Sequence, residues 1–304
     1  MTAGHDPDHE YLTARELAAL LRVRERKVYE LAAAGEVPCS RATGKLLFRR
    51  TAVDAWLARA SSGPADDPRP VPRAAVFAGS HDPLLEWALR ECGAGLATYF
   101  DGSLDGVERF AAGGAVASAL HVPGLGGGLD DADWNVPLVR ERFGAEPVVL
   151  VAFARRRRGL IVAPEAAGEI RRVADLAGRR VVPRQAGAGG QVLFERQLAA
   201  AGLAEDAFER IAPARTESDA ALAVAEGRAD VACGLPGPAR QLGLGFVPLV
   251  EERFDLLIER RAWFEPALQR LFAFCRTEPF ARRAASLTGY DTGVLGEVRF
   301  NGEG

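Results

Sequence analysis

The feature that most limits how this chain can fold is a proline-rich stretch at residues 60–73, which reads ASSGPADDPRPVPR. Its four prolines lack an amide hydrogen and fix the backbone φ angle, so neither a helix nor a continuous strand can run through it. A spacer of this composition is stiffer than a Gly/Ser tether. We therefore expect a linker at residues 60–73 that separates a small domain, residues 12–59, from a larger one, residues 74–304.

The overall composition is that of an ordinary globular protein, with 48% hydrophobic and 26% charged residues. Residues 1–11 are largely polar and lack an apolar signal core, so we expect a disordered tail there. No run of about eighteen apolar residues occurs, and the sequence therefore predicts a cytoplasmic protein without a membrane partner. The four cysteines show no CxxC spacing and only four histidines are present, which predicts reduced thiols, no metal site and no cofactor.

Residues 12–59 carry the signals of a compact helical unit. Thr13 and Glu16 form a capping-box pattern at the start of one helix, and a second helix is expected over residues 24–34, with Gly35 as its C-terminal stop. Residues 39–48 are expected to form two short strands that turn near Gly44, and a third helix follows. Helix, turn, helix, hairpin and helix together predict a winged helix-turn-helix.

The run LTARELAALLRVRERKVYELAAAGEVPCSRATGKLLFRRTAVDAWL resembles the excisionase and MerR-like DNA-binding domains. Ten basic and five acidic side chains give residues 12–59 a local charge of +5, although the whole chain has a net charge of −3. The alternative interpretation of this charge is an arginine-rich solvated face. The resemblance implies that double-stranded DNA is contacted by the start of the second helix and by the wing, through Arg24, Arg26, Lys27, Arg41, Lys45, Arg49 and Arg50.

The larger domain shows strands that end in glycine-containing turns at helix N-termini. Residues 74–78 form a short apolar segment before the turn at residues 79–82, and the same order recurs at residues 99–103 and 181–190. Free amides and the helix dipole make such turns suitable for anions. Alternating strands and helices predict an α/β fold with largely parallel sheets.

Six stretches carry a resemblance to a periplasmic-binding-protein-like domain of type II, related to molybdate- and tungstate-binding proteins. They are GSHDPLLEW, FDGSLDGVERFAAGGA, RRGLIVAPE, DLAGRRVVPRQAGAGG, AVAEGRADVACG with GLGFVPLVEERFDLLI, and LTGYDTG. The resemblance implies two lobes that close around a ligand. The first lobe would comprise about residues 74–150 and 246–304, and the second about residues 151–245.

Carried over to this sequence, the resemblance implies two facing walls of a ligand cleft. One wall comprises Gly79, Ser80, His81, Asp82 and Ser103, and the opposing wall comprises Arg184, Gln185, Gly187, Gly189 and Gly190. Hydroxyls, open backbone amides and one guanidinium suit an oxyanion or a carboxylate. The alternative is that Ser80 and Ser103 only cap helices and that Arg184 pairs with a surface acid.

At four further candidate positions the sequence departs from the family pattern. Gln191 replaces a cation after the glycine turn, His121 and Asn135 lie in altered segments, and Glu217 places a carboxylate where relatives have a ring. A carboxylate opposes a dianion, so these changes favour a small organic ligand, zwitterionic or with one acidic group, over molybdate or tungstate. Residues 155–158, RRRR, are expected to form a solvated loop between the lobes.

These features favour a ligand-controlled transcriptional regulator that acts as a homodimer on a two-fold operator. The alternative is an excisionase-like recombination or architectural factor whose larger domain only mediates assembly. An enzyme is not expected, because adjacent Ser80, His81 and Asp82 cannot converge on one substrate atom and no nucleotide-binding motif occurs.

Overall fold

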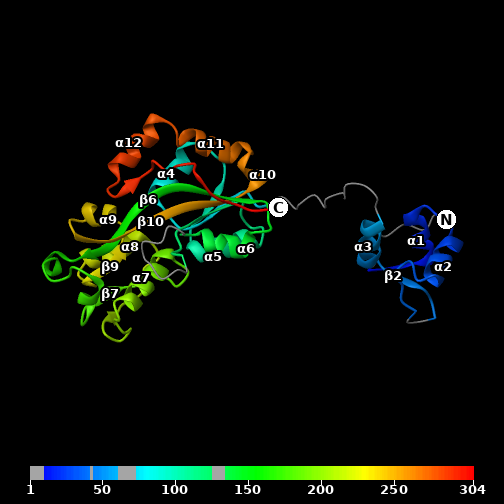
Figure 1. Ribbon diagram of the computed structural model, residues 1–304, viewed down its shortest axis with the longest axis horizontal. Coiled ribbons are helices and arrows are strands. Elements are labelled where there is room, and N and C mark those ends of the chain that lie inside the picture. The colour runs from blue at the N-terminus through cyan, green and yellow to red at the C-terminus, as the bar shows by residue number, and fades with distance from the viewer. Residues whose placement is uncertain (1–9, 42–43, 61–72, 125–133) are drawn as a thin grey trace. The chain divides into compact units, whose positions relative to one another are not determined.

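The computed structural model describes residues 10–41, 44–60, 73–124 and 134–304 (Figure 1). It divides into two compact units, Met1–Pro72 and Arg73–Gly304, which are described separately below. Residues 1–9 of the expected tail and residues 61–72 of the expected linker lie outside the described residues.

The N-terminal unit is built from three helices and two short strands among its described residues. In chain order these are β1 (Tyr11–Thr13), α1 (Ala14–Leu21), α2 (Glu25–Ala33), β2 (Leu47–Arg49) and α3 (Arg50–Ala60). The predicted capping box is confirmed, because the Glu16 amide donates to Thr13 Oγ1 at 3.3 Å and the Thr13 amide donates to Glu16 Oε2 at 2.7 Å. Leu17, Val28, Phe48 and Val53 are fully buried and form the core.

The wing differs from the predicted hairpin within residues 39–48. Only one strand, β2, forms there, and the opposite side contributes a single bridge between Ser40 and Leu47. The main partner of β2 is β1, in antiparallel register from Tyr11 opposite Arg49 to Thr13 opposite Leu47. This pairing is favoured because it buries Leu12 against the core, whereas Ser40 is exposed.

The second unit is organised around one curled mixed sheet. Among the described residues its strands follow the order β4-β3-β5-β10-β6-β9-β7-β8, and β11 and β12 also pair with β6. The strands are β3 (Val76–Gly79), β4 (Ala97–Tyr99), β5 (Ala117–Leu120), β6 (Val148–Val162), β7 (Arg180–Val182), β8 (Glu209–Arg210), β9 (Val231–Gly234), β10 (Gly245–Glu259), β11 (Tyr290–Asp291) and β12 (Val298–Asn301).

The helices of this unit pack on both faces of the sheet. They are α4 (Pro83–Glu91), α5 (Ser103–Ala111), α6 (Val136–Phe143), α7 (Gly189–Ala200), α8 (Glu217–Ala225), α9 (Pro236–Gln241), α10 (Arg260–Trp263), α11 (Pro266–Phe274) and α12 (Glu278–Ser286), with short 3-10 turns at Pro164–Ala166 and Val173–Leu176. In the first lobe, α4, α11 and α12 share one buried cluster with the sheet, and α5 and α6 share another on the opposite face (Figure 1).

Two long strands connect the lobes. β6 and β10 pair antiparallel over their whole length, from Val148 opposite Glu259 to Val162 opposite Gly245. The prediction of largely parallel sheets therefore holds for the outer strands of each lobe but not for this central pair, because the chain crosses to the second lobe in β6 and returns in β10. Phe153 and Phe254 pack in the core of the first lobe, whereas Ile161 packs in that of the second. The crossing segments lie between these residues.

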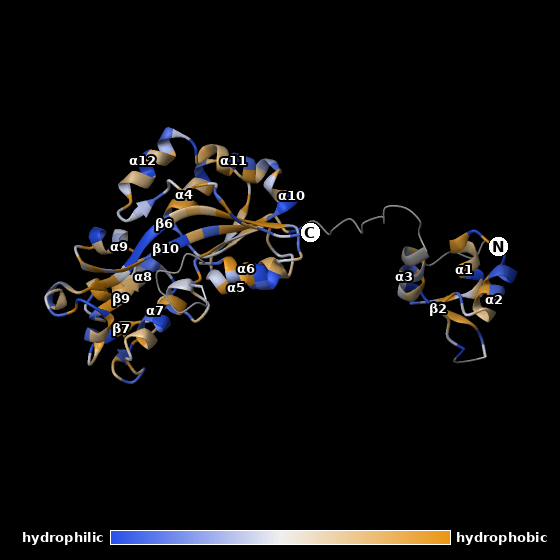
Figure 2. Ribbon diagram, in the orientation of Figure 1, coloured by the Kyte–Doolittle hydropathy of each residue, from blue (hydrophilic) through white to orange (hydrophobic). Residues whose placement is uncertain are grey.

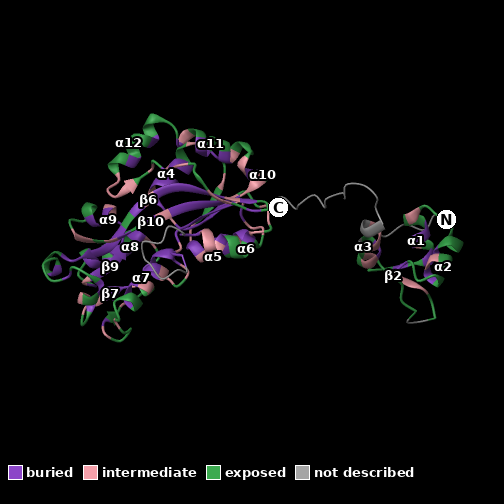
Figure 3. Ribbon diagram, viewed as in Figure 1, coloured by how far each residue is buried: buried purple, intermediate pink, exposed green. Residues whose placement is uncertain are grey.

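The middle of the crossing pair is unusual for a buried sheet. Figure 2 shows a hydrophilic stretch in β6 between two apolar ends, and Figure 3 shows the same strand largely buried. This stretch contains Arg156 and Arg158, both 1% exposed. The expectation of a solvated loop at residues 155–158 is therefore wrong. Strand alternation points every second arginine inward, where carboxylates compensate its charge.

Candidate functional site

The predicted DNA-contacting residues of the second helix are exposed. Arg24 precedes α2 as its N-cap residue, and Arg26 and Lys27 lie in its first turn. Arg26 Nε lies 3.1 Å and Lys27 Nζ 4.0 Å from the exposed carboxylate of Glu30. Such surface pairs are weak and easily exchanged for other anions, so this helix end offers positive charge to a phosphate or a base edge.

The remaining basic candidates lie around β2. Arg41 and Lys45 are exposed on either side of residues 42–43, which lie outside the described residues. Arg49 pairs with Glu10 at 2.9 Å, and Arg50 is partly buried at the start of α3. Arg49 forms a surface pair of the same weak kind as Arg26, so of these four residues Arg50 alone is less available for a phosphate.

The first wall of the cleft is formed where β3 and β5 end. Gly79 has a φ of 105°, and a Cβ there would lie 2.1 Å from the carbonyl oxygen of Ala119, so the turn requires glycine. Ser80 Oγ lies 2.8 Å from Ser103 Oγ, which also accepts a hydrogen bond from the His121 amide at 3.2 Å. The structure thus brings Ser80, Ser103 and His121 together at the strand ends.

The alternative role of the serines as helix caps does not match the observed contacts. Asp82 caps α4, because its Oδ1 accepts from the Leu85 amide at 2.8 Å. Gly102 is the N-cap residue of α5, without a side-chain cap. Ser80 and Ser103 are instead buried and bonded to each other.

Asp82 faces the crossing strands. Its Oδ2 accepts from Arg156 Nη1 at 2.7 Å and from the Tyr290 hydroxyl at 2.6 Å, and its side chain is fully buried. Asp82 therefore fixes the start of α4 to β6 and β11. Its role in this structure is to position the turn that carries Ser80 and His81.

Behind both walls lies a chain of buried ion pairs that the sequence reasoning did not identify. Glu252 of β10 contacts Arg156 Nη2 at 2.5 Å, Arg158 Nε at 2.7 Å and His121 Nδ1 at 2.9 Å. Arg158 continues to Glu217, whose Oε1 lies 2.9 Å from its Nη2. The alternation of inward arginines in RRRR is a signal in the sequence, but the opposing carboxylates become visible only in the fold, because Glu252 faces Arg156 in the β6–β10 register and Glu217 comes from the start of α8.

The ion pairs set the protonation states of this cluster. Burial alone would raise the pKa of Glu217, but the guanidiniums of Arg158 and Arg184 hold it at about 2. Burial opposes ionisation of Glu252 in the same way, yet Arg156 and Arg158 keep its pKa well below the ordinary value. Burial lowers the pKa of His121 despite its contact with Glu252, so the ring is neutral at pH 7.

The second wall is formed by the turn between β7 and α7. Arg184 Nη1 donates to Glu217 Oε1 at 2.9 Å, while its Nε and Nη2 donate to the carbonyls of Ala214 and Arg215. Gln191 accepts from the Arg184 amide at 2.8 Å and fixes the turn. Arg184 is thus paired with a buried acid, since the Glu217 side chain is only 7% exposed.

The two walls touch. Gln185 Nε2 donates to the carbonyl of Asp101 at 2.9 Å, and the Leu104 amide donates to the carbonyl of Gly187 at 3.1 Å. A Cβ on Gly189 would lie 2.7 Å from Ser103 Oγ, so only glycine permits this approach. The lobes are therefore closed on each other in this structure.

The closed walls leave a cavity of about 10 Å³, which is about the space of one water molecule. Seven of the predicted residues line it: Ser80, His81, His121, Arg184, Gln185, Gly190 and Glu217. Five residues that sequence reasoning missed line it as well: Phe100, Asp101, Gly102, Ala188 and Arg215. Gly79, Asp82, Ser103, Gly187, Gly189 and Gln191 lie outside this lining and support it through the contacts described above.

Asn135 does not line the cavity. Its Oδ1 accepts from the Val122 amide at 2.6 Å, and its Nδ2 donates to Asp255 Oδ2 at 2.7 Å. Burial raises the pKa of Asp255 to about 6 in spite of this hydrogen bond. The preceding Trp134 packs against Leu193 and Val250, so it contributes to packing near the lobe junction.

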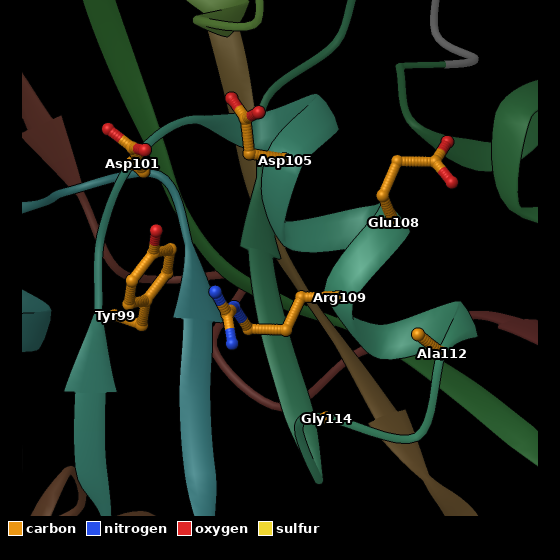
Figure 4. Close-up of a pocket in the computed structure, with 7 residues that line it drawn as sticks. All are labelled: Tyr99, Asp101, Asp105, Glu108, Arg109, Ala112 and Gly114. Atoms are coloured by element: carbon orange, nitrogen blue, oxygen red, sulfur yellow. The ribbon is translucent and has the colours of Figure 1, made fainter.

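A larger hollow lies on the outer surface of the first lobe, beside β4 and α5 (Figure 4). It measures about 420 Å³ and contains Arg109 stacked 3.7 Å from the centre of the Tyr99 ring. Of its three acids, Glu108 pairs with Arg142 at 2.7 Å and Asp101 with Arg215 at 3.6 Å, and Asp105 is the third. None of the predicted ligand-binding residues lines it.

The described residues contain neither a membrane-spanning helix nor a metal-binding cluster. No helix is long and apolar enough to cross a membrane. Within residues 10–41, 44–60, 73–124 and 134–304, no cluster of three or more His, Cys, Asp or Glu side chains is placed to hold a metal ion.

Comparisons with known protein families match both units. Residues 86–276 match the family described as the PBP superfamily domain, and residues 11–61 match a helix-turn-helix domain. A curated relative, the uncharacterized protein YvgK of Bacillus subtilis, is 25% identical over 309 aligned positions, which cover 94% of this chain and 96% of YvgK. These matches agree with the general type of both predicted domains. They do not address the excisionase or MerR-like type, or molybdate and tungstate specificity.

Solved structures that are similar in fold include a regulatory domain and a binding protein. The regulatory domain of the LysR family regulator MetR from N. meningitidis has a TM-score of 0.49 and 12% identity, covering 71% of this chain and 96% of that one. A putative phosphate transporter substrate-binding protein from Clostridium perfringens, with bound phosphate, has a TM-score of 0.48 and 13% identity, covering 69% and 96%.

Proposed function

Since this chain belongs to the PBP superfamily domain family and carries a helix-turn-helix domain, we propose that it is a one-component, ligand-responsive DNA-binding regulator. Its larger unit binds a small anionic or zwitterionic molecule between the lobes, and this binding alters the affinity of the helix-turn-helix unit for an operator. The observation that carries the proposal is the pair of polar walls, around Ser80 and Arg184, that meet across one junction in a chain with a basic helix end.

The geometry of the junction supports a switch. In the described residues the lobes are connected covalently by β6 and β10, while the Gln185–Asp101 and Leu104–Gly187 hydrogen bonds join their rims. A cavity of about 10 Å³ admits a ligand only after these rim contacts open. A ligand that binds one state better shifts the population toward that state, and this difference in affinity is sufficient for regulation.

The proposal includes several further expectations. The protein acts as a homodimer in the cytoplasm, because a single small DNA-binding unit reads only one half-site of a two-fold operator. It is not an enzyme and requires no cofactor, since the Ser80 and Ser103 hydroxyls bond to each other and Arg184 bonds to Glu217, so that neither serine is arranged as an activated nucleophile.

The first test is DNA selection followed by affinity measurement. We would select binding sequences from random duplexes with the full chain, then measure fluorescence anisotropy with and without small carboxylates, amino acids and sulfonates. We expect a preferred sequence and a several-fold change in DNA affinity with one ligand class. Absence of any sequence preference at moderate salt would contradict a regulator, and a ligand that binds without changing DNA affinity would contradict the switch.

A second function is favoured by one specific observation, the small volume of the closed cavity. If the lobes never open, the larger unit serves assembly alone, and the chain is an excisionase-like recombination or architectural factor. Cross-linking the lobes distinguishes the two functions. A disulfide that ties the Gln185 turn to the Asp101 loop would leave an architectural factor fully active and would abolish any response to ligand in a regulator.

A further inference from the structure

Glu217 occupies a position in the cleft that a ligand anion would be expected to take. It is the first residue of α8, and Thr216 caps this helix by accepting from the Asp219 amide at 3.0 Å. Its Oε1 receives hydrogen bonds from both Arg158 Nη2 and Arg184 Nη1, each at 2.9 Å. Charge-assisted hydrogen bonds from guanidiniums to carboxylate oxygens are also the kind of contact with which proteins hold anionic ligands.

The glycine turn closes directly over this pair. A Cβ on Gly190 would lie 2.8 Å from Arg158 Nη1 and 3.8 Å from Glu217 Oε1. Arg158 Nη1 and Glu217 Oε2 are buried and have no hydrogen-bond partner among the described residues. A donor and an acceptor therefore lie without hydrogen-bond partners beneath the glycine turn, and of these two residues Glu217 also lines the cavity.

The charges that line the cavity balance. Its walls contain the guanidiniums of Arg184 and Arg215 and the carboxylates of Asp101 and Glu217. Immediately behind them, Arg156 and Arg158 are compensated by Asp82 and Glu252. A doubly charged oxyanion would thus enter a site without net positive charge and would have to displace or approach a buried carboxylate.

We infer that Glu217 is a built-in counter-anion that sets the specificity of the cleft, so that it excludes divalent oxyanions and admits ligands with at most one net negative charge. This inference rests on the proposed function, because it concerns the ligand class of the same cleft. Glu217 then determines whether the cleft binds an inorganic dianion or binds a zwitterion or monocarboxylate.

The inference is tested by converting the carboxylate into its neutral isostere. In Glu217→Gln the side-chain carbonyl still accepts from Arg158 and Arg184, but the cleft gains one unit of positive charge. We would titrate the full-length wild type and variant with sodium sulfate and sodium molybdate by calorimetry, against sodium chloride of equal ionic strength. We expect no specific binding to the wild type and a gain of at least about tenfold in affinity in the variant.

Two control variants make the gain specific. Glu226→Gln removes the same charge from the opposite end of α8, where Glu226 pairs with exposed Arg228, and it should behave as the wild type. Arg184→Gln combined with Glu217→Gln removes one guanidinium and should cancel the gain. A folded Glu217→Gln protein without oxyanion binding, or an equal gain in Glu226→Gln, would overturn the inference.

The wild type provides a test that does not depend on the variant's folding. Sulfate or molybdate at millimolar concentration should leave its thermal unfolding midpoint unchanged relative to chloride, and specific stabilisation by either dianion would contradict the inference. The outcome is separable from that of the proposed function. If Glu217→Gln binds sulfate while no cleft ligand alters DNA affinity, the specificity role stands and the regulatory switch fails.

Discussion

Arginine occupies two opposite environments in this chain. At the start of α2 the Arg26 side chain is 90% exposed and shares one weak contact with Glu30. In the middle of β6 the Arg156 and Arg158 side chains are 1% exposed and contact Asp82, Glu252 and Glu217. In the N-terminal unit the arginine charge is therefore exposed to solvent, whereas in the second unit it is neutralised by buried carboxylates.

The difference shows how to interpret an arginine-rich sequence. An exposed guanidinium retains its hydration and can exchange one anion for another at small cost, which suits contact with a phosphate. A buried guanidinium is stable only while its carboxylate partners remain, because the loss of either leaves an uncompensated charge in the interior. Substitutions at buried and at exposed charges should therefore differ in their effect on stability and on DNA binding.

The largest effect is expected at Glu252, which joins three partners in the buried cluster. Glu252→Gln removes the charge that compensates both Arg156 and Arg158 and should lower the free energy of unfolding by about 3 to 5 kcal/mol. Urea unfolding monitored by circular dichroism measures this. The adjacent Glu251→Gln, whose side chain is 58% exposed, should change the value by less than about 0.5 kcal/mol. If both variants lowered the free energy of unfolding equally, the contrast between buried and exposed charges would be wrong.

Asp255 is a buried carboxylate whose hydrogen-bond partner is the amide of Asn135 instead of a guanidinium. Its pKa is raised by burial from 3.8 to about 6, so the folded state binds the proton more tightly than the unfolded state does. The stability from this group is complete below pH 4 and is lost as the pH rises through 6. The shift corresponds to about 3 kcal/mol.

Measuring the free energy of unfolding between pH 4 and 7.5 for the wild type and Asp255→Asn tests this prediction. The difference between the two proteins should change with pH in that window, with the wild type losing stability relative to the variant as the pH rises. The acids with lowered pKa values, Glu217 and Glu252, lose their contribution below this window and cancel in the difference. A difference that is constant with pH would show that burial does not raise the pKa of Asp255.

Local chemistry allowed several of these features to be predicted from the sequence. Thr13 and Glu16 specify a helix start within four residues. Gly79 indicates a tight turn in which a side chain would clash with the neighbouring backbone. The facing of Ser80 and Arg184 followed from the resemblance, since both lie at strand ends. Such signals need few residues and little knowledge of tertiary pairing.

The buried cluster could not be predicted because its partners are brought together by long-range pairing. Arg156 contacts Glu252 because the β6–β10 register places them opposite each other. Asp82 and Tyr290 form a hydrogen bond although they are 208 positions apart in the sequence. The sequence predicts Asn135 near a ligand, but its contacts with Val122 and Asp255 depend on how two distant segments pack. A single sequence contains the residues of these pairs and no record of the distances between them.

The exposed arginines should matter for DNA and little for stability. The double variant Arg24→Gln and Arg26→Gln should weaken operator binding by about tenfold to a hundredfold and reduce the salt dependence of the affinity by about two units of slope. Anisotropy titrations at several salt concentrations measure both quantities. Arg282→Gln, an exposed arginine of the other unit paired with Glu278, serves as the matched control and should leave them unchanged. If the double variant binds DNA as tightly as the wild type, the start of α2 does not contact DNA.

The smallest effect is expected at Glu30, the acid beside the exposed cations. Glu30→Gln removes contacts to Arg26 and Lys27 that are each worth about 0.3 to 0.5 kcal/mol at most, so stability should barely change. DNA affinity should nevertheless rise by about threefold at low salt, because one negative charge near the phosphates is lost and two cations are released. The rise should disappear at high salt, where screening shortens the range of the field. If the variant instead loses affinity, Glu30 must orient Arg26 for a specific contact, and the exposed pair would act as a fixed element of the interface like its buried counterparts.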